Sequence, residues 1–428
     1  MRHPDRREFL RCSAALAGSV LLPGAGRAAL GPDEKYDLLL RNADVLDPSQ
    51  GLRGRRDIAM RFGRIAAVAP SVAPDSAQRV MDAGGKLVTP GLIDLHAHTY
   101  PFGSGIGIPA DELVAHQCTT TVVSAGDAGA NNIAAWRRFI VPGGRTRQYA
   151  FVHIALAGLA GFPVPELYNI DYAQVDATAR AVAENADIVL GVKVRMSENV
   201  IARHGAEPLR RAIAACERSG VAGVKVMMHI GGVSDRALMS TLLDMLRPGD
   251  ILTHCYSGAP NNAGDGTNIV QDGKLLPAAL AAKQRGVVFD IGHGGGSFDY
   301  TIAEAAIAQG CVMDTISSDV HVYSANTPGM PYLPWVMSKF LAMGHSLEQV
   351  VAMVTQVPAR VIGREPKLGT LQLGAPADLS LLEVVEGPVG FVDSRNNRRD
   401  GKVHLRPAGN IVSGVAFGRP YQAPFSVH

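Results

Sequence analysis

The sequence has few cysteines, few charged residues and no long hydrophobic run. Its five cysteines are spread over 428 residues without paired spacing, which argues against a disulfide framework or a zinc site made of thiolates. Charged residues make up only 19%, with 41 basic and 39 acidic side chains. A formal charge of +2 gives no strong field for polyanions, so nucleic acid is not expected as a partner. We expect a small-molecule substrate instead.

What the chain does contain is typical of a large globular protein. Hydrophobic residues account for 47%, and 47 glycines and 26 prolines punctuate the sequence. This composition differs from that of disordered chains and of membrane bundles. A length of 428 residues suffices for one large domain or two to three ordinary ones.

The first 28 residues have the layout of a cleavable leader. Paired arginines, Arg6 and Arg7, precede Phe9-Leu10 and the apolar run Cys12–Leu22, and the segment resembles a twin-arginine export signal. The apolar run is shorter than the roughly 20 residues that span a bilayer, so no stable membrane anchor is expected. We therefore predict recognition by the twin-arginine export machinery and a periplasmic or secreted protein. An ordinary basic tail is the alternative.

Short runs with strand character lie near both ends of the remaining chain. A turn is expected at Phe62-Gly63-Arg64 and a polar hairpin at Asp393–Lys402. The two ends, 29–88 and 366–428, therefore predict one small β domain. The expected strands are Asp37–Leu46, Asp57–Met60, Ile65–Ala69, Lys86–Thr89, Ala377–Glu383 and Asn410–Phe417.

Strands and helices alternate between these ends, over 89–365. Helical segments separate the apolar runs, as at Pro208–Glu217, Arg236–Leu246 and Thr301–Gln309, and Ser346 opens a capping box for a helix toward Gly363. Eight strand and helix units predict an α/β fold of the (β/α)₈ TIM-barrel type. A doubly wound sheet is disfavoured because no glycine-rich phosphate loop follows the first strand. The eight runs are Leu92–Leu95, Thr119–Ser124, Tyr149–Leu156, Ile188–Val194, Val221–Met228, Asp250–Thr253, Val287–Ile291 and Asp314–Ser317.

Potential metal ligands stand at the ends of these predicted strands. His96 and His98 are two residues apart on an extended segment, so both imidazoles can reach one ion, although a buried hydrogen-bonded pair would show the same spacing. Later strand ends carry Lys193, His229, His254 and Asp319. From His98 to Asp319 is 221 residues, about seven barrel units of roughly 31 residues each. Residues scattered through a core have no reason to keep that register.

Several motifs resemble those of the amidohydrolase superfamily. They are VTPGLIDLHAH at 88–98, the Lys/His/His/Asp set and TQVPAR at 355–360. GVKVRMS at 191–197 and GHGGGSF at 292–298 resemble the dihydroorotase-related deacetylase branch more narrowly. The resemblance implies a barrel flanked by a β-sandwich from both termini, and a centre of two divalent metal ions, most simply Zn²⁺.

The resemblance also assigns the ligands of that centre. It places His96, His98 and Asp319 on one metal, His229 and His254 on the other, and Lys193 on both. Lys193 would act as a carbamate formed with carbon dioxide, because an ammonium group repels two cations whereas a carbamate offers each of them an oxygen. A salt-bridged lysine and a one-metal site are the alternatives.

The expected reaction is hydrolysis by a metal-bound hydroxide. Asp319 would be the catalytic proton shuttle between the attacking water and the leaving group. Arg195 could bind a substrate carboxylate or form a structural ion pair, and Tyr256 and His293 could contact substrate or merely pack. No Gly-X-Ser-X-Gly elbow supports serine catalysis.

The sequence thus predicts an exported metal-dependent amidohydrolase or deacetylase acting on an N-acyl or cyclic amide of a small molecule. The same centre could hydrolyse an ester, a lactone or an acylated hydroxy acid. A periplasmic metal or ligand binder without turnover is the non-enzymatic alternative. The substrate, the metal and self-association into a homo-oligomer stay open.

Overall fold

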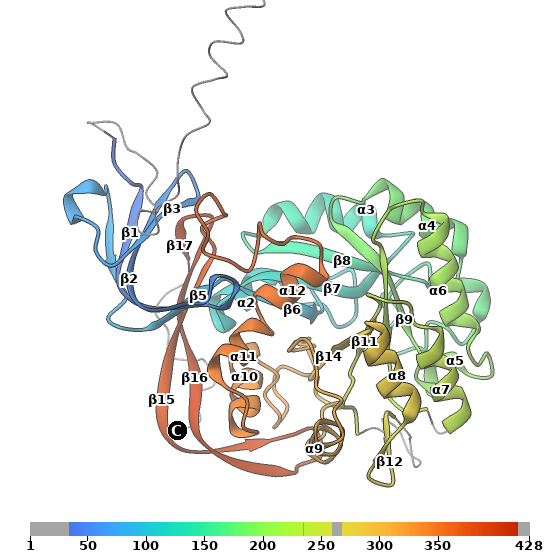
Figure 1. The fold of residues 1–428 in the computed structure, drawn as a ribbon. Coiled ribbons are helices and arrows are strands. Elements are labelled where there is room, and N and C mark those ends of the chain that lie inside the picture. The colour runs from blue at the N-terminus through green and yellow to red at the C-terminus, as the bar shows by residue number, and fades with distance from the viewer. Residues whose placement is uncertain (1–33, 234, 259–267, 418–428) are drawn as a thin grey trace, which may run out of the picture.

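Two sheets organise the chain in the computed structural model (Figure 1), which describes residues 34–233, 235–258 and 268–417. The predicted leader at 1–28 lies outside the described residues. The first sheet contains eight strands in the order β17-β16-β15-β5-β1-β2-β3, with β4 paired to β1. Its strands are β1 (Leu38–Asp47), β2 (Leu52–Arg61), β3 (Arg64–Ala69), β4 (Val80–Asp82), β5 (Leu87–Pro90), β15 (Leu379–Val392), β16 (Arg398–Val412) and β17 (Val415–Phe417).

This sheet joins the two ends of the chain, as the sequence predicts. The N-terminal strand β5 pairs antiparallel with β15, with Leu379 opposite Pro90. One buried hydrophobic cluster combines side chains of both ends, including Val45, Ile58 and Ile411. The turn between β2 and β3 is the expected one, because Phe62 and Gly63 both have the positive φ that a tight hairpin needs. The expected sandwich is built as one continuous sheet.

The second sheet is a parallel barrel of seven strands in the order β14-β11-β10-β9-β8-β7-β6. Its fifth strand is shorter than the predicted Val221–Met228, because Gly223 adopts a positive φ and the strand starts only at Lys225. The strands are β6 (Leu92–Ala97), β7 (Thr119–Gly129), β8 (Arg147–His153), β9 (Val189–Arg195), β10 (Lys225–His229), β11 (Ile251–Thr253) and β14 (Val288–Asp290).

Helices surround this barrel (Figure 1). The capping box at Ser346 is present, but the helix that it opens ends at Ala352 and a second one starts at Gln356, so the expected single helix toward Gly363 is wrong. The α-helices are α2 (Ala110–Gln117), α3 (Ile133–Ala135), α4 (Val175–Glu184), α5 (Glu198–Ile201), α6 (Glu207–Arg218), α7 (Arg236–Met245), α8 (Pro277–Arg285), α9 (Tyr300–Ala308), α10 (Leu333–Ala342), α11 (Leu347–Ala352) and α12 (Gln356–Val361). A minor hairpin consists of β12 (Val270–Gln271) and β13 (Lys274–Leu275).

The eighth strand predicted at Asp314–Ser317 is the main correction. The closing segment, residues 314–320, forms no regular strand, but isolated bridges pair Thr315 with Asp290 and Val320 with Ala97. Backbone hydrogen bonds accompany them: the N–H of Ile291 donates to the carbonyl of Thr315, and the N–H of His98 donates to the carbonyl of Val320, both at 3.1 Å. Because Asp290 ends β14 and Ala97 ends β6, these bridges connect the last barrel strand to the first. The segment therefore closes the barrel at the position of an eighth strand without being one.

Two buried carboxylates hold this closing segment in place. Asp290 accepts hydrogen bonds from the hydroxyls of Thr315 and Ser317, both at 2.7 Å. Asp94, on the first barrel strand, accepts from the hydroxyl of Ser318 at 2.5 Å and from its backbone N–H at 3.0 Å. Side-chain hydrogen bonds thus add to the backbone hydrogen bonds that close the barrel.

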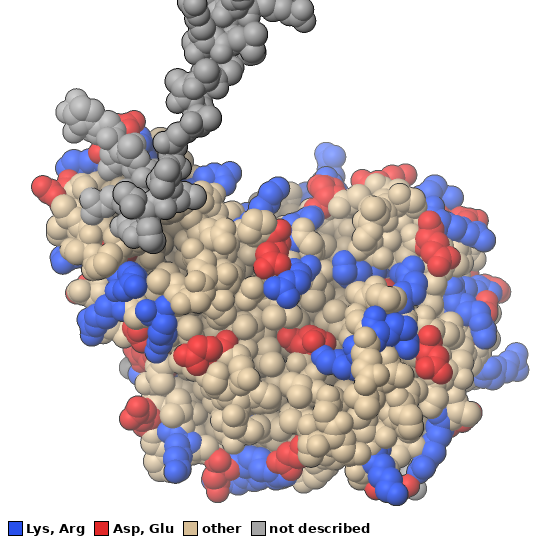
Figure 2. Space-filling model, viewed as in Figure 1, with Lys and Arg blue, Asp and Glu red and all other residues tan. Residues whose placement is uncertain are grey.

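Charged side chains of both signs are interspersed over the molecular face in Figure 2. Several of them form ion pairs, such as Arg137 with Asp187 and Arg399 with Glu304. In the described part of the chain, no helix has the length and apolar character needed to cross a bilayer.

Asp290→Ala should destabilise the protein by about 3 kcal/mol, because three buried hydroxyls, those of Thr253, Thr315 and Ser317, lose an acceptor worth roughly 1 kcal/mol each. Urea unfolding measures the change. Asp187→Ala, which removes an exposed ion pair, is the control and should cost less than about 1 kcal/mol. Equal effects of the two substitutions would contradict the role given to Asp290.

Candidate metal centre

The six predicted ligands meet at the C-terminal ends of the barrel strands. The imidazole Nε2 of His96 lies 3.1 Å from Nζ of Lys193 and 3.3 Å from Oδ1 of Asp319. The Nε2 of His98 lies 3.1 Å from the same carboxylate oxygen. The rings of His229 and His254 are 4.2 Å apart between centroids. Their positions are β6 for His96, the residue after β6 for His98, β9 for Lys193, the end of β10 for His229, the residue after β11 for His254, and the closing segment for Asp319.

Hydrogen bonds at Nδ1 orient three of the four imidazoles. Because each Nδ1 contacts an acceptor outside the cluster, Nε2 is the nitrogen that faces the centre, as in metal sites whose histidines are fixed by outer partners. The Thr253 hydroxyl donates to Asp290 and therefore accepts from His96. The three pairs are His96 with Thr253 at 2.7 Å, His98 with Asp127 at 3.0 Å and His254 with the carbonyl of Gly292 at 2.6 Å.

Two nitrogens of this cluster have no partner among the described residues. The Nε2 atoms of His229 and His254 are buried and make no hydrogen bond. Buried polar atoms normally have a partner, so their convergence indicates a site for a ligand. One atom each from His96, His254 and Asp319 lies within 4.8 Å of the others, a grouping that can hold a metal ion. Imidazole and carboxylate donors of this kind suit zinc and similar divalent ions.

Burial and charge shift the pKa values of the cluster. Burial lowers the pKa of Lys193 to about 7, so a neutral amine is accessible near physiological pH. Burial also acts on His98, but the carboxylates of Asp127 and Asp319 outweigh it and raise its pKa to about 9. For Asp319, the hydrogen bond from His98 and nearby imidazoles overcome burial and lower the pKa. The carboxyl of Asp319 is therefore ionised.

The backbone is strained at two of the candidate ligands. His254 has φ +61° and Asp319 has φ +49°, in the left-handed region that residues with a side chain seldom adopt. Such conformations cost roughly 1–3 kcal/mol and persist where surrounding structure imposes them, commonly at functional sites. The fold thus imposes strain on the two positions that project from β11 and from the closing segment.

A cavity of about 230 Å³ opens above the cluster. Its floor contains candidate ligands, and its walls combine apolar side chains with two further polar ones and a glycine-rich loop. The lining residues are His98, Ile106, Leu159, Phe162, Lys193, Arg195, His229, Gly295, Gly296, Ser297, Asp319 and His321. A polar floor under a partly apolar wall is typical of a small-molecule site.

Arg195 forms a structural ion pair, one of its two sequence-based interpretations, while contact with a substrate carboxylate stays a prediction. It lines the cavity, and its guanidinium forms an ion pair with Glu166 at 3.0 Å. Glu166 also lies 3.2 Å from Nε2 of His153, whose Nδ1 accepts from the N–H of Ala155. Because Nδ1 is an acceptor, the ring proton of a neutral His153 lies on Nε2, the nitrogen nearest Glu166. A buried three-residue network therefore fixes Arg195 at the edge of the cavity.

Sequence reasoning missed Glu166, His153 and Asp127. Asp127 was detectable as a lone acidic residue in the otherwise uncharged stretch Thr119–Gly129. His153 is the last residue of the third barrel strand, and this position at a strand end could have marked it as a candidate site residue. Glu166 lies in a loop and had no such signal.

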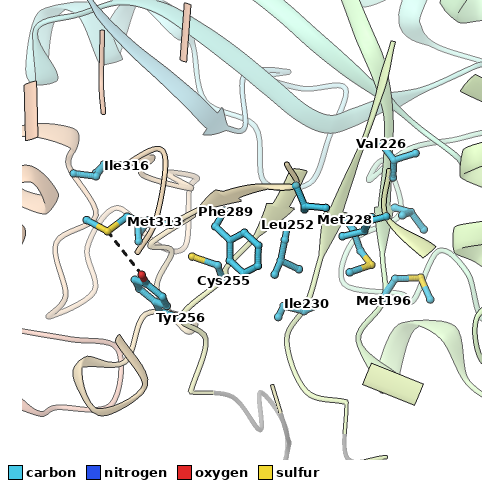
Figure 3. Packing of buried hydrophobic residues seen from close by; sticks show 14 of the residues in the cluster. Met196, Val226, Met228, Ile230, Leu252, Cys255, Tyr256, Phe289, Met313 and Ile316 are labelled. Carbon is cyan, nitrogen blue, oxygen red and sulfur yellow. Dashed lines mark hydrogen bonds between the residues drawn. The ribbon is translucent and has the colours of Figure 1, made fainter. Parts of the chain in front are cut away.

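Tyr256 and His293 are corrections, since neither lines the cavity. The Tyr256 ring is buried among hydrophobic residues, and Figure 3 shows its hydroxyl directed at the sulfur of Met313. The same hydroxyl donates to the carbonyl of Cys311 at 2.6 Å. His293 stacks on Phe298, and its Nε2 accepts from Lys339 at 2.7 Å. Their places beside strand ends left substrate contact and packing as alternatives, and both side chains pack inside the protein.

Comparison with known proteins agrees with this geometry. The model of the amidohydrolase family matches residues 299–416. A deacetylase of Agrobacterium fabrum is 35% identical over 364 residues, which cover 85% of this chain and 86% of that protein. The chain belongs to the amidohydrolase family. Another deacetylase, from Enterococcus faecalis, is 29% identical over 89% of this chain and 99% of its own length.

Solved structures of the family confirm the predicted fold class. The crystal structure of an adenine deaminase matches with a TM-score of 0.80 and 30% identity, over 90% of this chain and 100% of that one. The crystal structure of a dihydroorotase gives a TM-score of 0.80 and 32% identity, over 90% and 99%. As an amidohydrolase, the chain is a hydrolase of carbon–nitrogen bonds other than peptide bonds. The family generally uses divalent metals, with which the His96, His254 and Asp319 cluster is consistent.

The Glu166 network makes a pH-dependent contribution to stability. Burial opposes ionisation of Glu166, but Arg195 outweighs it and lowers the pKa from 4.5 to about 2. The contribution is therefore complete above pH 4.5 and is lost as the pH falls toward 2. Urea unfolding should find Glu166→Gln less stable by about 3 kcal/mol at pH 5 and by about 1.5 kcal/mol at pH 3.

Glu304→Gln is the control for this prediction, since Glu304 pairs with Arg399 at the surface. Its stability difference from the wild type should stay below about 1 kcal/mol at both pH values. A Glu166→Gln difference that does not change with pH would show that its charge does not stabilise the fold.

Proposed function

We propose that the chain hydrolyses an amide bond of a small molecule, either an N-acyl group or a cyclic amide, with two divalent metal ions. The observation that carries this proposal is the convergence of four imidazoles, Lys193 and Asp319 below one cavity. The relatives named deacetylases support the N-acyl version, and the structure titled a dihydroorotase supports the cyclic one.

The donor set divides naturally between two ions. His96, His98 and Asp319 would hold one ion, and His229 and His254 the other. Lys193 lies between them and would serve both as a carbamate, because its neutral Nζ can form a bond to the carbon of carbon dioxide and release one proton. When bound, two zinc ions would activate a water molecule and polarise the substrate carbonyl.

Asp319 is the residue that would move the proton. Its Oδ1 is engaged by His98, while Oδ2 lies 4.0 Å from Nε2 of His254 and faces Gly294, where a side-chain carbon would stand only 2.5 Å away. The absence of a side chain at Gly294 thus leaves this oxygen accessible. Oδ2 would take a proton from the attacking water and return it to the departing nitrogen.

Arg195 would orient the substrate. Its contact with Glu166 uses one terminal guanidinium nitrogen, Nη1. The other nitrogens of the guanidinium group could donate to an acceptor on the substrate. A carboxylate or carbonyl oxygen on the substrate suits these donors. Ile106, Leu159 and Phe162 would contact the apolar part of the same molecule.

Turnover of a substrate panel by zinc-loaded protein tests the proposed reaction. We expect release of acid or amine from at least one N-acyl amino acid or cyclic amide, and a fall in kcat of about 100-fold or more for Asp319→Asn. Asp187→Asn, at the surface, should retain full activity. Hydrolysis of esters alone would reassign the protein as an esterase, and tight binding without turnover would make it a binding protein.

Zinc content tests the role of Lys193 separately. We expect two equivalents per chain in the wild type and one or none in Lys193→Ala. Gly126→Ala should also lower the zinc content, since its new methyl group would stand 2.6 Å from Cγ of Lys193, whereas Gly161→Ala has no neighbour within 4 Å and is the control. Two equivalents retained in Lys193→Ala would exclude a bridging lysine.

A further inference from the structure

The tip of the β15–β16 hairpin lies against the barrel, far from the rest of its own sheet. The two strands leave the β domain, pass below α10 and α11, and end near α9 (Figure 1). The tip is ordered by Asp393, whose carboxylate accepts from the backbone N–H groups of Arg395 at 2.7 Å and Asn397 at 2.9 Å. It also accepts from the N–H of Tyr300 at 2.9 Å, which attaches the tip to the start of α9. The hairpin tip is therefore held at a defined place on the barrel.

At that place, the tip contacts the glycine-rich loop that forms one wall of the cavity. Gly295, Gly296 and Ser297 line the cavity. The guanidinium of Arg395 donates to the carbonyl of Gly296 at 2.6 Å, and the N–H of Ser394 donates to the carbonyl of Phe298 at 3.0 Å. Glycines have no side chains with which to anchor themselves, so backbone hydrogen bonds fix the position of this wall.

Lys339 reinforces the same connection from below. Its buried ammonium donates to Nε2 of His293 at 2.7 Å, to the carbonyl of Gly329 at 2.5 Å and to the carbonyl of Val392 at 2.7 Å. Lys339 thereby connects three segments: the start of the glycine-rich loop at His293, the chain after the closing segment at Gly329, and the hairpin at Val392. His293, which was expected to contact substrate, instead belongs to this support.

The opposite side of the loop faces the catalytic carboxylate. The N–H of Gly294 donates to the carbonyl of Ser318 at 2.9 Å, next to Asp319 in sequence. The loop thus lies between the hairpin on the outside and Asp319 on the inside. A displacement of the hairpin tip would therefore shift Gly296 and the cavity wall first, and the candidate metal ligands less.

We infer that Arg395 is a positioning residue for substrate binding, which sets the cavity wall through the carbonyl of Gly296. The β domain, through this hairpin, is then part of what selects the substrate. This inference rests on the proposed hydrolysis in so far as it concerns substrate affinity. It assigns a role to a residue that touches neither the substrate nor a metal ligand.

Steady-state kinetics on the best substrate of the panel test the inference. Arg395→Ala should raise KM about fivefold, the effect of one lost hydrogen bond, and leave kcat within about twofold. Arg395→Lys, which keeps one donor, should recover part of the loss. Arg398→Ala, which removes an exposed arginine of the same hairpin, is the matched control and should leave KM unchanged. An unchanged KM in Arg395→Ala, or an equal fall in kcat for both alanine variants, would overturn the inference.

Hydrogen exchange of the loop separates this inference from the proposed function. Backbone amides in 292–299 should exchange faster in Arg395→Ala than in the wild type or Arg398→Ala, with the thermal midpoint unchanged. This measurement needs no turnover, so a wild type that is inactive on the panel refutes the proposed function alone. Identical exchange in all three proteins would refute the positioning role of Arg395.

Discussion

The orientation of the candidate metal ligands depends on acceptors for the Nδ1–H groups of buried imidazoles. Burying a ring nitrogen without a hydrogen-bond partner costs free energy, so three of the four rings turn one nitrogen toward an acceptor that the barrel provides. Thr253, Asp127 and the carbonyl of Gly292 provide these acceptors, and the Nε2 atoms consequently face one another. The geometry of the site follows from the hydrogen bonds behind it.

The same hydrogen bonds connect the site to the closure of the barrel. Asp290 accepts from Thr253, which orients His96, and from Thr315 and Ser317, which belong to the closing segment. Asp319 projects from that segment only a few residues later. Stability of the barrel and alignment of the Asp319 carboxylate therefore depend on shared buried groups, so a substitution that disturbs one is expected to affect the other.

The β domain joins the two ends of the chain and also contacts the wall of the cavity. Its longest hairpin reaches the cavity wall through Arg395 and joins a buried cluster around Lys339. The candidate metal ligands all come from the barrel, whereas the wall above them contacts both domains. If the proposed reaction and the role inferred for Arg395 hold, substitutions in the hairpin would change substrate affinity without changing the candidate metal ligands.

The sequence by itself determined the barrel and the β domain formed by both ends of the chain, because strand periodicity and turn residues are local or regular signals. It also identified the six residues of the candidate centre, through the spacing of strand ends and the resemblance of its motifs to those of the family. Only the tertiary structure decided that residues 314–317 close the barrel without a ladder, that Tyr256 and His293 point inward, and that Glu166 pairs with Arg195. Each of these depends on a contact between distant segments. A residue's neighbours in sequence fix its place along a strand, but the partner across the fold fixes where its side chain points.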